Sequence, residues 1–249
     1  MIDLHSHILP GVDDGAKNRE AAEEMLRRAV GAGVDVIVAT SHYSPEAELV
    51  YEQTFTEFAA HAATFGVSLL PGMEYDYEWL SEIPPDQLRG IGSTNWVLID
   101  FKQLFLPSGA NELLFKLRLQ GRRVMVAHPE RLFGRRYAEN IDQITGDFGL
   151  QINAGSLLGR HGRETVLAAF DILSSYPYCL IAGDAHRPEH FRFPECEKKL
   201  RRFFPAGCVD IWMRENPRRL LAGEALRECV VPPSVWRKMR WKIASLIDS

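Results

Sequence analysis

Five of the eight histidines lie where a short apolar run ends: His5, His7, His42, His128 and His186. Acidic side chains end three comparable runs, at Glu74, Asp100 and Asp184. Each run has the length and composition of a buried parallel strand. A buried carboxylate costs on the order of several kcal/mol unless it meets a cation, and imidazole with carboxylate suits divalent transition metals. The pattern predicts a metal centre at the ends of several strands.

Two pairs of these residues share one spacing, His5 with His7 and Asp184 with His186. Residues i and i+2 of a strand project to the same face, so both members of a pair can reach one ion from a rigid element. A His-x-His pair alone arises often by chance. The ligand-type residues at the other strand ends favour the metal interpretation.

An acidic loop between glycines, Gly11-Val12-Asp13-Asp14-Gly15, follows the first pair. It can bend back over the strand ends, and Asp14 is well placed to supply an oxygen ligand. Asp13 and Asp14 could instead cap the helix that is predicted to start near Arg19. Because that start is several residues away, we favour the ligand role for one of them.

Arg131 stands three residues after His128. A guanidinium there can bind phosphate oxygens in a bidentate fork, which lysine cannot match. The alternative is a salt bridge with Glu130 or another acid at the rim. Several metals together with an arginine suit phosphoryl transfer, so we favour the phosphate role.

The chain length of 249 residues suits one α/β barrel. Seven strands are predicted: Met1 to His5, Val34 to Ala39, Ser68 to Pro71, Val97 to Asp100, Arg123 to Ala127, Leu150 to Asn153 and Cys179 to Ala182. Helical patterns alternate with them: Arg19 to Ala32, Glu52 to Phe65, Asn111 to Gln120, Tyr137 to Asp147, Glu164 to Ser175 and Pro194 to Phe204. Because ligand types end every strand rather than one crevice, a single-domain α/β barrel fits better than an open sheet.

A net charge of −4 gives no global reason to bind nucleic acid. We find no apolar stretch of about 20 residues and no signal peptide, so a cytoplasmic protein without a transmembrane segment is expected. Four cysteines at irregular spacing predict reduced thiols, and the sequence does not predict the oligomeric state.

Two cysteines match the Cys-x5-Arg spacing of cysteine-dependent tyrosine phosphatases, Cys196 to Arg202 and Cys208 to Arg214. A phosphate cradle needs small, glycine-rich residues that can turn their N–H groups inward. The intervening EKKLR and VDIWM are instead a solvated helix pattern and a bulky apolar one. We interpret both matches as accidental.

Three further features leave alternatives open. The loop with Arg160, His161 and Arg163 could contact substrate or be merely solvated, and Asn153 could hydrogen-bond a ligand. The basic and aromatic extension at 224–249, with Trp236 and Trp241, could contact a membrane surface or an oligomer partner, although packing against the barrel is the default. We expect His61 to be a surface or packing histidine, and His190 has no assigned role.

The segments MIDLHSHILPGVDDGAK, TSH, GME, AHPER, QINAG and GDAH together resemble the polymerase and histidinol phosphatase (PHP) superfamily. Within it, the chain most resembles the bacterial manganese-dependent protein-tyrosine phosphatases encoded with capsule and exopolysaccharide genes, the CpsB/CapC family. The resemblance runs from Met1 to about Leu221. It implies a distorted (β/α)7 barrel, similar to a TIM barrel, over a single domain of residues 1–249.

The resemblance also implies a cluster of three Mn²⁺ ions, with Fe, Co or Zn as other possibilities. By analogy one ion takes His5, His7, Glu74 and Asp184, a second takes Asp100 and His128 and shares Glu74, and a third takes Asp14, His42 and His186. Relatives often carry Glu at the Asp100 position, so that ion's distance is in question. The family uses two phosphate-binding arginines, matched by Arg131 and by either Arg192 or Arg187, with spacing favouring Arg192.

The implied reaction is metal-assisted hydrolysis of phosphotyrosine, with Asp14, His42 or His186 able to assist proton transfer. Tyrosine has a pKa of about 10 and is a good leaving group, so a strong general acid is less necessary. The implied substrate is the tail of an autophosphorylated bacterial tyrosine kinase. The alternatives are a phosphatase for a small phosphomonoester such as histidinol phosphate, and a non-catalytic regulatory protein with a metal-stabilised fold.

Overall fold

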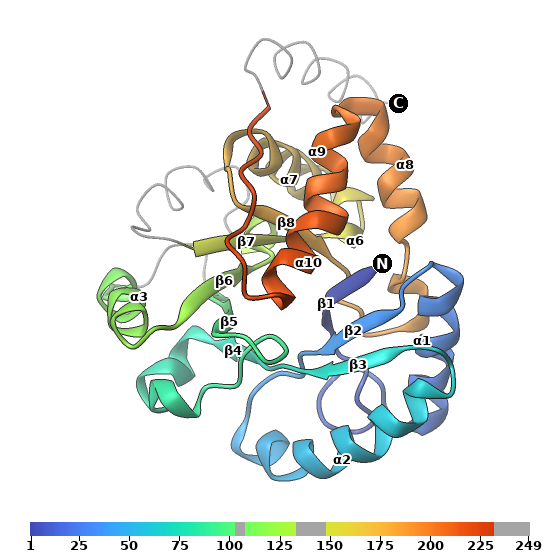
Figure 1. Cartoon of the computed structure of the whole chain (residues 1–249), viewed down its shortest axis with the longest axis vertical. Helices are drawn as coiled ribbons and strands as arrows, with labels where there is room; N and C mark the ends of the chain where they lie inside the picture. Colours follow the sequence, from blue (N-terminus) through green and yellow to red (C-terminus); the bar gives the residue numbers. More distant parts are fainter. Residues whose placement is uncertain (103–107, 133–147, 232–249) are drawn as a thin grey trace.

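The computed structural model describes residues 1–102, 108–132 and 148–231 (Figure 1). Its elements are, in order, β1 (Ile2–Ser6), α1 (Arg19–Gly31), β2 (Val36–Ala39), α2 (Pro45–Ala63), β3 (Ser68–Pro71), β4 (Glu74–Asp76), η1 (Tyr77–Ser81), η2 (Pro85–Gln87), β5 (Trp96–Asp100), α3 (Ala110–Leu119), β6 (Arg123–Ala127), α4 (Pro129–Leu132), β7 (Phe148–Asn153), α6 (Ala154–Leu157), α7 (Arg163–Ser175), β8 (Cys179–Ala182), η4 (Pro188–His190), α8 (Phe193–Phe203), α9 (Ala206–Asp210), η5 (Ile211–Glu215) and α10 (Asn216–Leu221).

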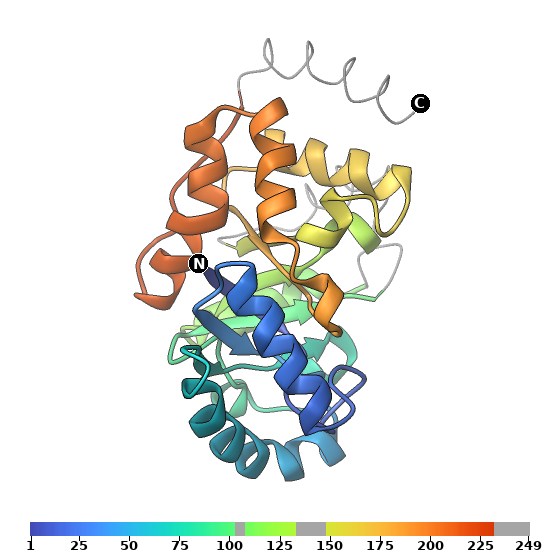
Figure 2. The same cartoon turned by 90° about the vertical axis from the view of Figure 1, so that its right-hand side faces the viewer.

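The described strands form two parallel sheets, one with the order β1-β2-β3 and one with the order β4-β5-β6-β7-β8. Isolated parallel bridges join the sheets at two places, Ser6 with Ala185 and His42 with Glu74. Figures 1 and 2 show the strands in the middle of the molecule with helices around them. The chain is therefore an α/β fold with parallel sheets in a single domain, and its strand ends meet on one side.

Each of the seven predicted strands corresponds to an observed one, but β4, which follows the third of them, was not predicted. There the chain leaves β3 and enters β4 of the other sheet, with only Gly72 and Met73 between the two strands. A Cβ at Gly72 would lie 2.6 Å from Cγ1 of Val38. The close approach to β2 therefore requires glycine at this bend.

Four of the predicted helices begin within one residue of observed ones: α1, α3, α7 and α8. Helix α2 begins at Pro45 rather than Glu52, because the Ser44 side chain accepts a hydrogen bond from the Ala47 N–H and proline suits the first turn. The prediction missed residues 206–221, which form α9, η5 and α10. The predicted helix Tyr137 to Asp147 lies outside the described residues.

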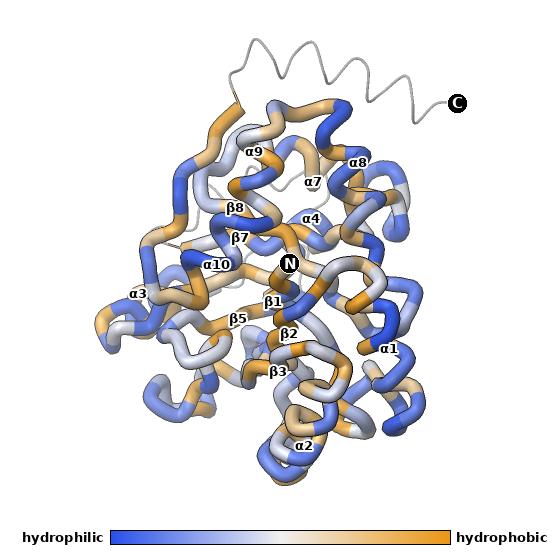
Figure 3. Tube along the Cα trace, turned by 45° about the vertical axis from the view of Figure 1, so that its right-hand side comes forward, coloured by the Kyte–Doolittle hydropathy of each residue, from blue (hydrophilic) through white to orange (hydrophobic). Residues whose placement is uncertain are grey.

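Alternate residues of β2, β5, β6 and β8 pack into two different apolar clusters. Ile37, Ile99 and Ile181 belong to the larger cluster, which also contains the buried faces of the helices. Val38, Leu98 and Leu180 belong to a second cluster built mostly of strand residues. These four strands are thus apolar on both faces. Figure 3 colours the traces of β2 and β5 mostly as hydrophobic.

The first part of the predicted extension packs against the fold. The N–H of Arg227 donates to Oδ1 of Asn216 at 2.7 Å, and the N–H groups of Cys229 and Val231 donate to carbonyls near the end of α7. Leu226 is buried in the second apolar cluster. Trp236 and Trp241 lie outside the described residues. Among the described helices, none is both long and apolar enough to span a membrane.

We predict that Gly15→Ala destabilises the protein by about 1–3 kcal/mol. An added Cβ would lie 2.0 Å from the carbonyl oxygen of His7, and a backbone atom cannot move aside cheaply. Gly31→Ala is the matched control, because it meets nothing within 4 Å at the end of α1. Urea denaturation of both variants measures the difference. Equal stability of the two variants would show that the loop yields freely.

Candidate metal centre

All nine predicted ligand residues converge on one side of the sheets, where most of them end or follow a strand and Glu74 opens β4 directly after β3. The structure contains four overlapping groups whose potential ligand atoms lie within 4.8 Å of one another: His7, Asp14, His42 and His186; His5, His128 and Asp184; His5, His7 and Glu74; and Glu74, Asp100 and His128. Residues from six strands or the loops that follow them contribute to the groups. A set this dense is far more specific than any one of its short motifs.

The Glu74 carboxylate lies at the centre of the cluster. Its Oε2 is 3.2 Å from Nε2 of His5, 3.3 Å from Nε2 of His7 and 3.1 Å from Nδ1 of His42. Yet Oε2 of Glu74 and Nδ1 of His42 are buried without a hydrogen-bond partner. Buried polar atoms that converge without hydrogen bonds suit a shared cation, so the donor set fits a metal.

Asp184 is the second carboxylate that several imidazoles share. Its Oδ1 lies 3.5 Å from Nε2 of His5, 3.4 Å from Nε2 of His7 and 3.3 Å from Nδ1 of His186. Its Oδ2 accepts hydrogen bonds from Arg131 and Asn153, each at 2.7 Å. One oxygen thus faces the cluster while protein donors hold the other, an arrangement typical of a metal-ligating carboxylate.

His128 and Asp100 form the far side of the cluster. Nε2 of His128 is 3.1 Å from Oε1 of Glu74, and Asp100 joins the group that these two residues form. The shorter side chain of aspartate therefore still reaches the cluster. His128 and Asp184 both have positive φ, 30° and 48°. Such strain in non-glycine residues is concentrated at functional sites.

The two aspartates of the acidic loop have different places. Asp14 is 70% exposed, and its Oδ1 lies 3.3 Å from Nε2 of His186 and 3.6 Å from Nε2 of His42. Asp13 has its carboxylate buried against the His7 ring. Asn18, rather than either aspartate, caps α1. The structure thus leaves Asp14 facing the cluster.

Two orienting residues were missed as such by sequence reasoning. Oδ2 of Asp13 is 2.7 Å from Nδ1 of His7 and accepts the N–H of His42. Oε1 of Gln151 is 2.8 Å from Nδ1 of His5, and its amide donates to Asn153. Bonds of this kind fix the ring so that its other nitrogen points at the ion. The Gln-x-Asn spacing on β7 was the available signal.

The electrostatics of the cluster depend on opposite charges in a buried space. Burial by itself raises the pKa of Glu74, but His5 and His128 hold the Glu74 pKa well below its usual range. Burial by itself lowers the pKa of His128, but Glu74, Asp100 and Asp184 raise it to about 9. The carboxylates thus favour the protonated form of His128, and Asp13, Asp184 and Glu74 likewise raise the pKa of His7. A metal would have to displace those protons.

The predicted phosphate-binding arginines differ in their surroundings. Arg131 binds Asp184 rather than Glu130, and its side chain is 35% exposed. Glu130 is buried and accepts the N–H of Asn153. Arg192 is exposed and lies 3.4 Å from Glu195, whereas Arg187 directly follows His186 and has no carboxylate partner among the described residues. Of these three arginines, Arg131 is the one that directly contacts a residue of the cluster.

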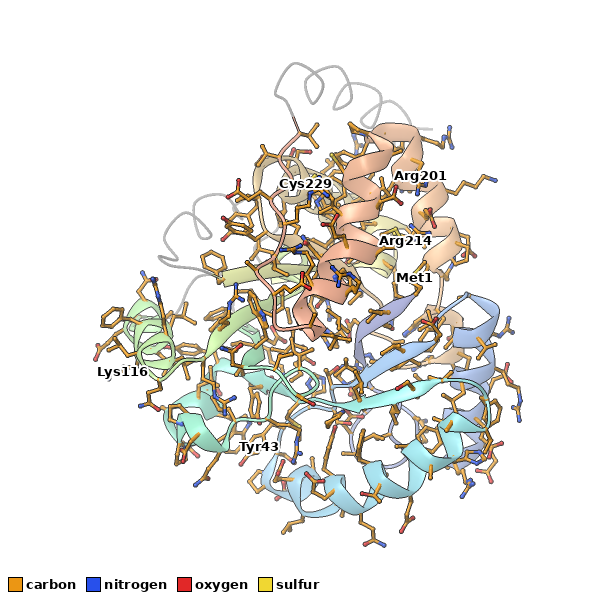
Figure 4. The ribbon with its side chains drawn as sticks, in the orientation of Figure 1. Met1, Tyr43, Lys116, Arg201, Arg214 and Cys229 are labelled. Atoms are coloured by element: carbon orange, nitrogen blue, oxygen red, sulfur yellow. The ribbon has the colours of Figure 1, made fainter. Side chains whose placement is uncertain are left out.

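The cysteine alternative has no geometric support. Cys196 is buried on α8, and burial raises the pKa of its thiol to about 12. Arg214, the partner of Cys208 in the second match, forms salt bridges with Glu197 and Asp210. Figure 4 labels it near Arg201, which contacts the same two acids. Neither cysteine lies in a phosphate cradle, which agrees with the interpretation of both matches as accidental.

Two other histidines, His61 and His190, were not predicted to be ligands, and the structure gives them different surroundings. His61 contacts Glu23 at 2.8 Å and packs beside Phe65, as expected of a surface histidine. His190 is buried, and its Nδ1 accepts the N–H of His186 at 3.0 Å. His190 therefore supports a predicted ligand, and sequence reasoning did not assign it this role.

We predict that Asp13→Asn lowers Mn²⁺ affinity by roughly 10- to 100-fold, as is typical when an orienting carboxylate is lost. Asparagine can still accept the Gly15 N–H, so the loop should remain folded. Asp86→Asn removes an equal charge from an exposed side chain and serves as control. Calorimetric titration of metal-free protein with Mn²⁺ provides the measurement. Unchanged affinity in Asp13→Asn would mean that this carboxylate does not orient a ligand.

Comparison with known proteins places this geometry in context. The chain is 28% identical over 257 residues to CapC of Staphylococcus aureus, covering 97% of this chain and 98% of that protein. It is 28% identical over 253 residues to the tyrosine-protein phosphatase YwqE of Bacillus subtilis, covering 96% and 98%.

A solved structure is also similar, with a TM-score of 0.76 and 26% identity over 94% of this chain and 99% of the solved one. It comes from work on YwqE of Bacillus subtilis and CpsB of Streptococcus pneumoniae, which are described as metal-dependent tyrosine phosphatases. A family model described as "Capsular polysaccharide synthesis, CpsB/CapC" matches residues 1–222. The chain belongs to the CpsB/CapC family.

Proposed function

We propose that this chain is a metal-dependent protein-tyrosine phosphatase. The observation that carries the proposal is the convergence of five imidazoles and four carboxylates in four overlapping groups, with Oε2 of Glu74 buried among them without a hydrogen-bond partner. Tyrosine-phosphatase names among the similar proteins, and their description as metal-dependent, support it. A non-catalytic protein would have no need to hold so many ligand types together with an arginine beside them.

The ligand groups suggest how three ions would be held. His5, His7, Glu74 and Asp184 would hold the first, and Asp100 and His128 would hold a second that shares Glu74. Asp14, His42 and His186 would hold the third, and His7 lies within reach of it. We propose Mn²⁺ as the native ion. When bound, such ions supply an activated water nucleophile and neutralise charge on the phosphoryl oxygens.

The protein's own groups would bind and orient the phosphate. Asp184 fixes one edge of the Arg131 guanidinium, which leaves further N–H groups to donate to phosphoryl oxygens. Arg192 or Arg187 would supply the second contact. The leaving tyrosinate needs little protonation, since its conjugate acid has a pKa of about 10. Asp14 and His42 are partly exposed, so the substrate would approach from their side and either residue, or His186, could transfer the proton.

We also propose that the two sheets together form the distorted seven-unit barrel of the PHP fold, with β3 and β4 as one interrupted strand. The two isolated bridges that join the sheets support this closure. So does the second apolar cluster, which takes alternate residues from both sheets and would fill the barrel interior.

The proposed substrate is a phosphotyrosine in an accessible protein segment, such as the tail of a bacterial tyrosine kinase in capsule or exopolysaccharide synthesis. The family description supports this setting. A cytoplasmic location would bring the enzyme and such a tail together.

We expect metal-stripped protein resupplied with Mn²⁺ to release phosphate from a phosphotyrosine peptide. His42→Ala should lower kcat/KM by at least roughly 100-fold, because a ligand is lost. Cys196→Ala and Cys208→Ala should keep the activity. If only histidinol phosphate is hydrolysed, the metal mechanism stands and the phosphotyrosine substrate is wrong. If neither substrate is hydrolysed, a non-catalytic binding protein is favoured.

Metal binding should also stabilise the fold. Mn²⁺ at 100 times its dissociation constant should add about 2.7 kcal/mol to the free energy of unfolding. Glu74→Gln should lose most of this gain, since it removes the charge at the centre of the cluster. Glu82→Gln, an exposed change, should keep it. Thermal unfolding with and without Mn²⁺ measures both. An equal Mn²⁺-dependent gain in Glu74→Gln would contradict the shared role of this carboxylate.

A further inference from the structure

A cavity with a basic lining adjoins the proposed catalytic cluster. It has a volume of about 850 Å³, and we call it the arginine cavity after Arg28, Arg160, Arg187 and Arg192, which line it together with His190. Two glutamates, Glu189 and Glu195, also line it. Four positive charges against two negative ones leave an excess of two positive charges.

The arginine cavity begins one residue from the metal cluster. The His186 N–H donates to Nδ1 of His190, and Arg187 is the next residue of the chain. Arg28 reaches the cavity from α1, which packs against η4. Arg160 reaches it from the loop after α6, and its electrostatic neighbours include Asp184 and Arg131. A peptide bound with its phosphate at the metals would therefore pass beside this cavity.

The arginines that line the cavity lack strong partners. Among the described residues, Arg160 and Arg187 have no hydrogen bond or ion pair to a carboxylate. Arg28 and Arg192 have only exposed contacts within their own helices, at 3.3 Å to Glu24 and 3.4 Å to Glu195. Exposed pairs of this kind contribute little. Most of the basic capacity of the cavity is thus free for a ligand.

Arg160 is nevertheless held in place. Its backbone N–H donates to the Gly155 carbonyl at 3.0 Å, and its Cδ lies 3.3 Å from where a Cβ of Gly155 would stand. Burial lowers the pKa of Arg160, and the Asp184 carboxylate opposes this shift, while the nearby Arg131 and Arg187 lower the pKa further. Guanidinium groups that lie close together repel one another, and a bidentate anion bound between them relieves that repulsion.

We infer that the arginine cavity is a subsite for a second anionic side chain of the peptide substrate, close in sequence to the phosphotyrosine. The inference rests on the proposed phosphatase function and deepens it. Arg28 and Arg160 define the subsite, since neither is proposed to bind the phosphotyrosine phosphate. The volume lies within the range of ligand pockets, about 300–1,000 Å³, so it can take a whole side chain and its neighbours. The ligand is a carboxylate or a phosphate on the peptide that carries the phosphotyrosine.

The test uses Mn²⁺-loaded full-length protein and three phosphotyrosine peptides that differ at the flanking positions, which carry glutamine, glutamate or phosphoserine. We expect kcat/KM to be higher for both anionic peptides than for the glutamine peptide, by roughly fivefold or more. The preference should appear mainly in KM and should fall as NaCl increases. A stronger effect of phosphoserine than of glutamate would identify a dianion as the better ligand.

Arg28→Gln and Arg160→Gln should each reduce the preference for the anionic peptides. Arg28→Gln should leave hydrolysis of para-nitrophenyl phosphate and of the glutamine peptide unchanged. Arg27→Gln is the matched control, because Arg27 lies on the same helix, pairs with Glu23 and Glu24, and does not line the cavity. It should keep the full preference.

The outcomes separate the two proposals. If para-nitrophenyl phosphate is hydrolysed and the three peptides are hydrolysed with equal kcat/KM, the subsite is overturned and the phosphatase proposal stays intact. A preference that persists in both Arg28→Gln and Arg160→Gln would also overturn it. Absence of hydrolysis for every substrate would overturn the phosphatase proposal, and the subsite with it.

Discussion

The buried carboxylate of Glu74 is the point on which the site depends. Three imidazole nitrogens from two strand ends approach its Oε2, and a fourth histidine, His128, approaches its other oxygen. A buried carboxylate of this kind is stable in its ionised form only if positive charge lies beside it, either from protonated imidazoles or from metal ions. Its position follows from the bend at Gly72, which moves the chain from one sheet into the other and brings Glu74 beside His42.

Around this centre, a second layer of contacts determines which atoms face inward. Asp13 holds His7, and Gln151 holds His5 and connects through Asn153 to Asp184. The layer links β1 to β7 and to the residues just after β8, so most ligands are positioned at or directly after a strand end. Asp14 lies farther from a strand, on an exposed loop. The ligands held by this layer are thus buried, whereas Asp14 faces solvent.

Arginine side chains that could bind an anionic substrate lie around the cluster. Arg131 contacts Asp184 there, and Arg187 leads from His186 into the arginine cavity. Positive groups placed beside a carboxylate-rich centre would separate the two proposed tasks, binding metals in the cluster and binding anions at its rim. Parallel sheets favour this division, because loops at the carboxyl ends of the strands surround the site without contributing to the core.

Much of this protein was predictable from its sequence. Apolar runs ending in ligand types identified all the described strands except β4, and all nine residues that converge. They did so because a polar side chain at the end of a buried strand is costly unless it binds a partner. The tertiary structure alone decided that Asp13 orients His7 while Asp14 faces the cluster, and that Arg28 and Arg160 line one cavity. Periodicity describes one element at a time, whereas these contacts join residues from separate elements, and only the packed chain sets their distances.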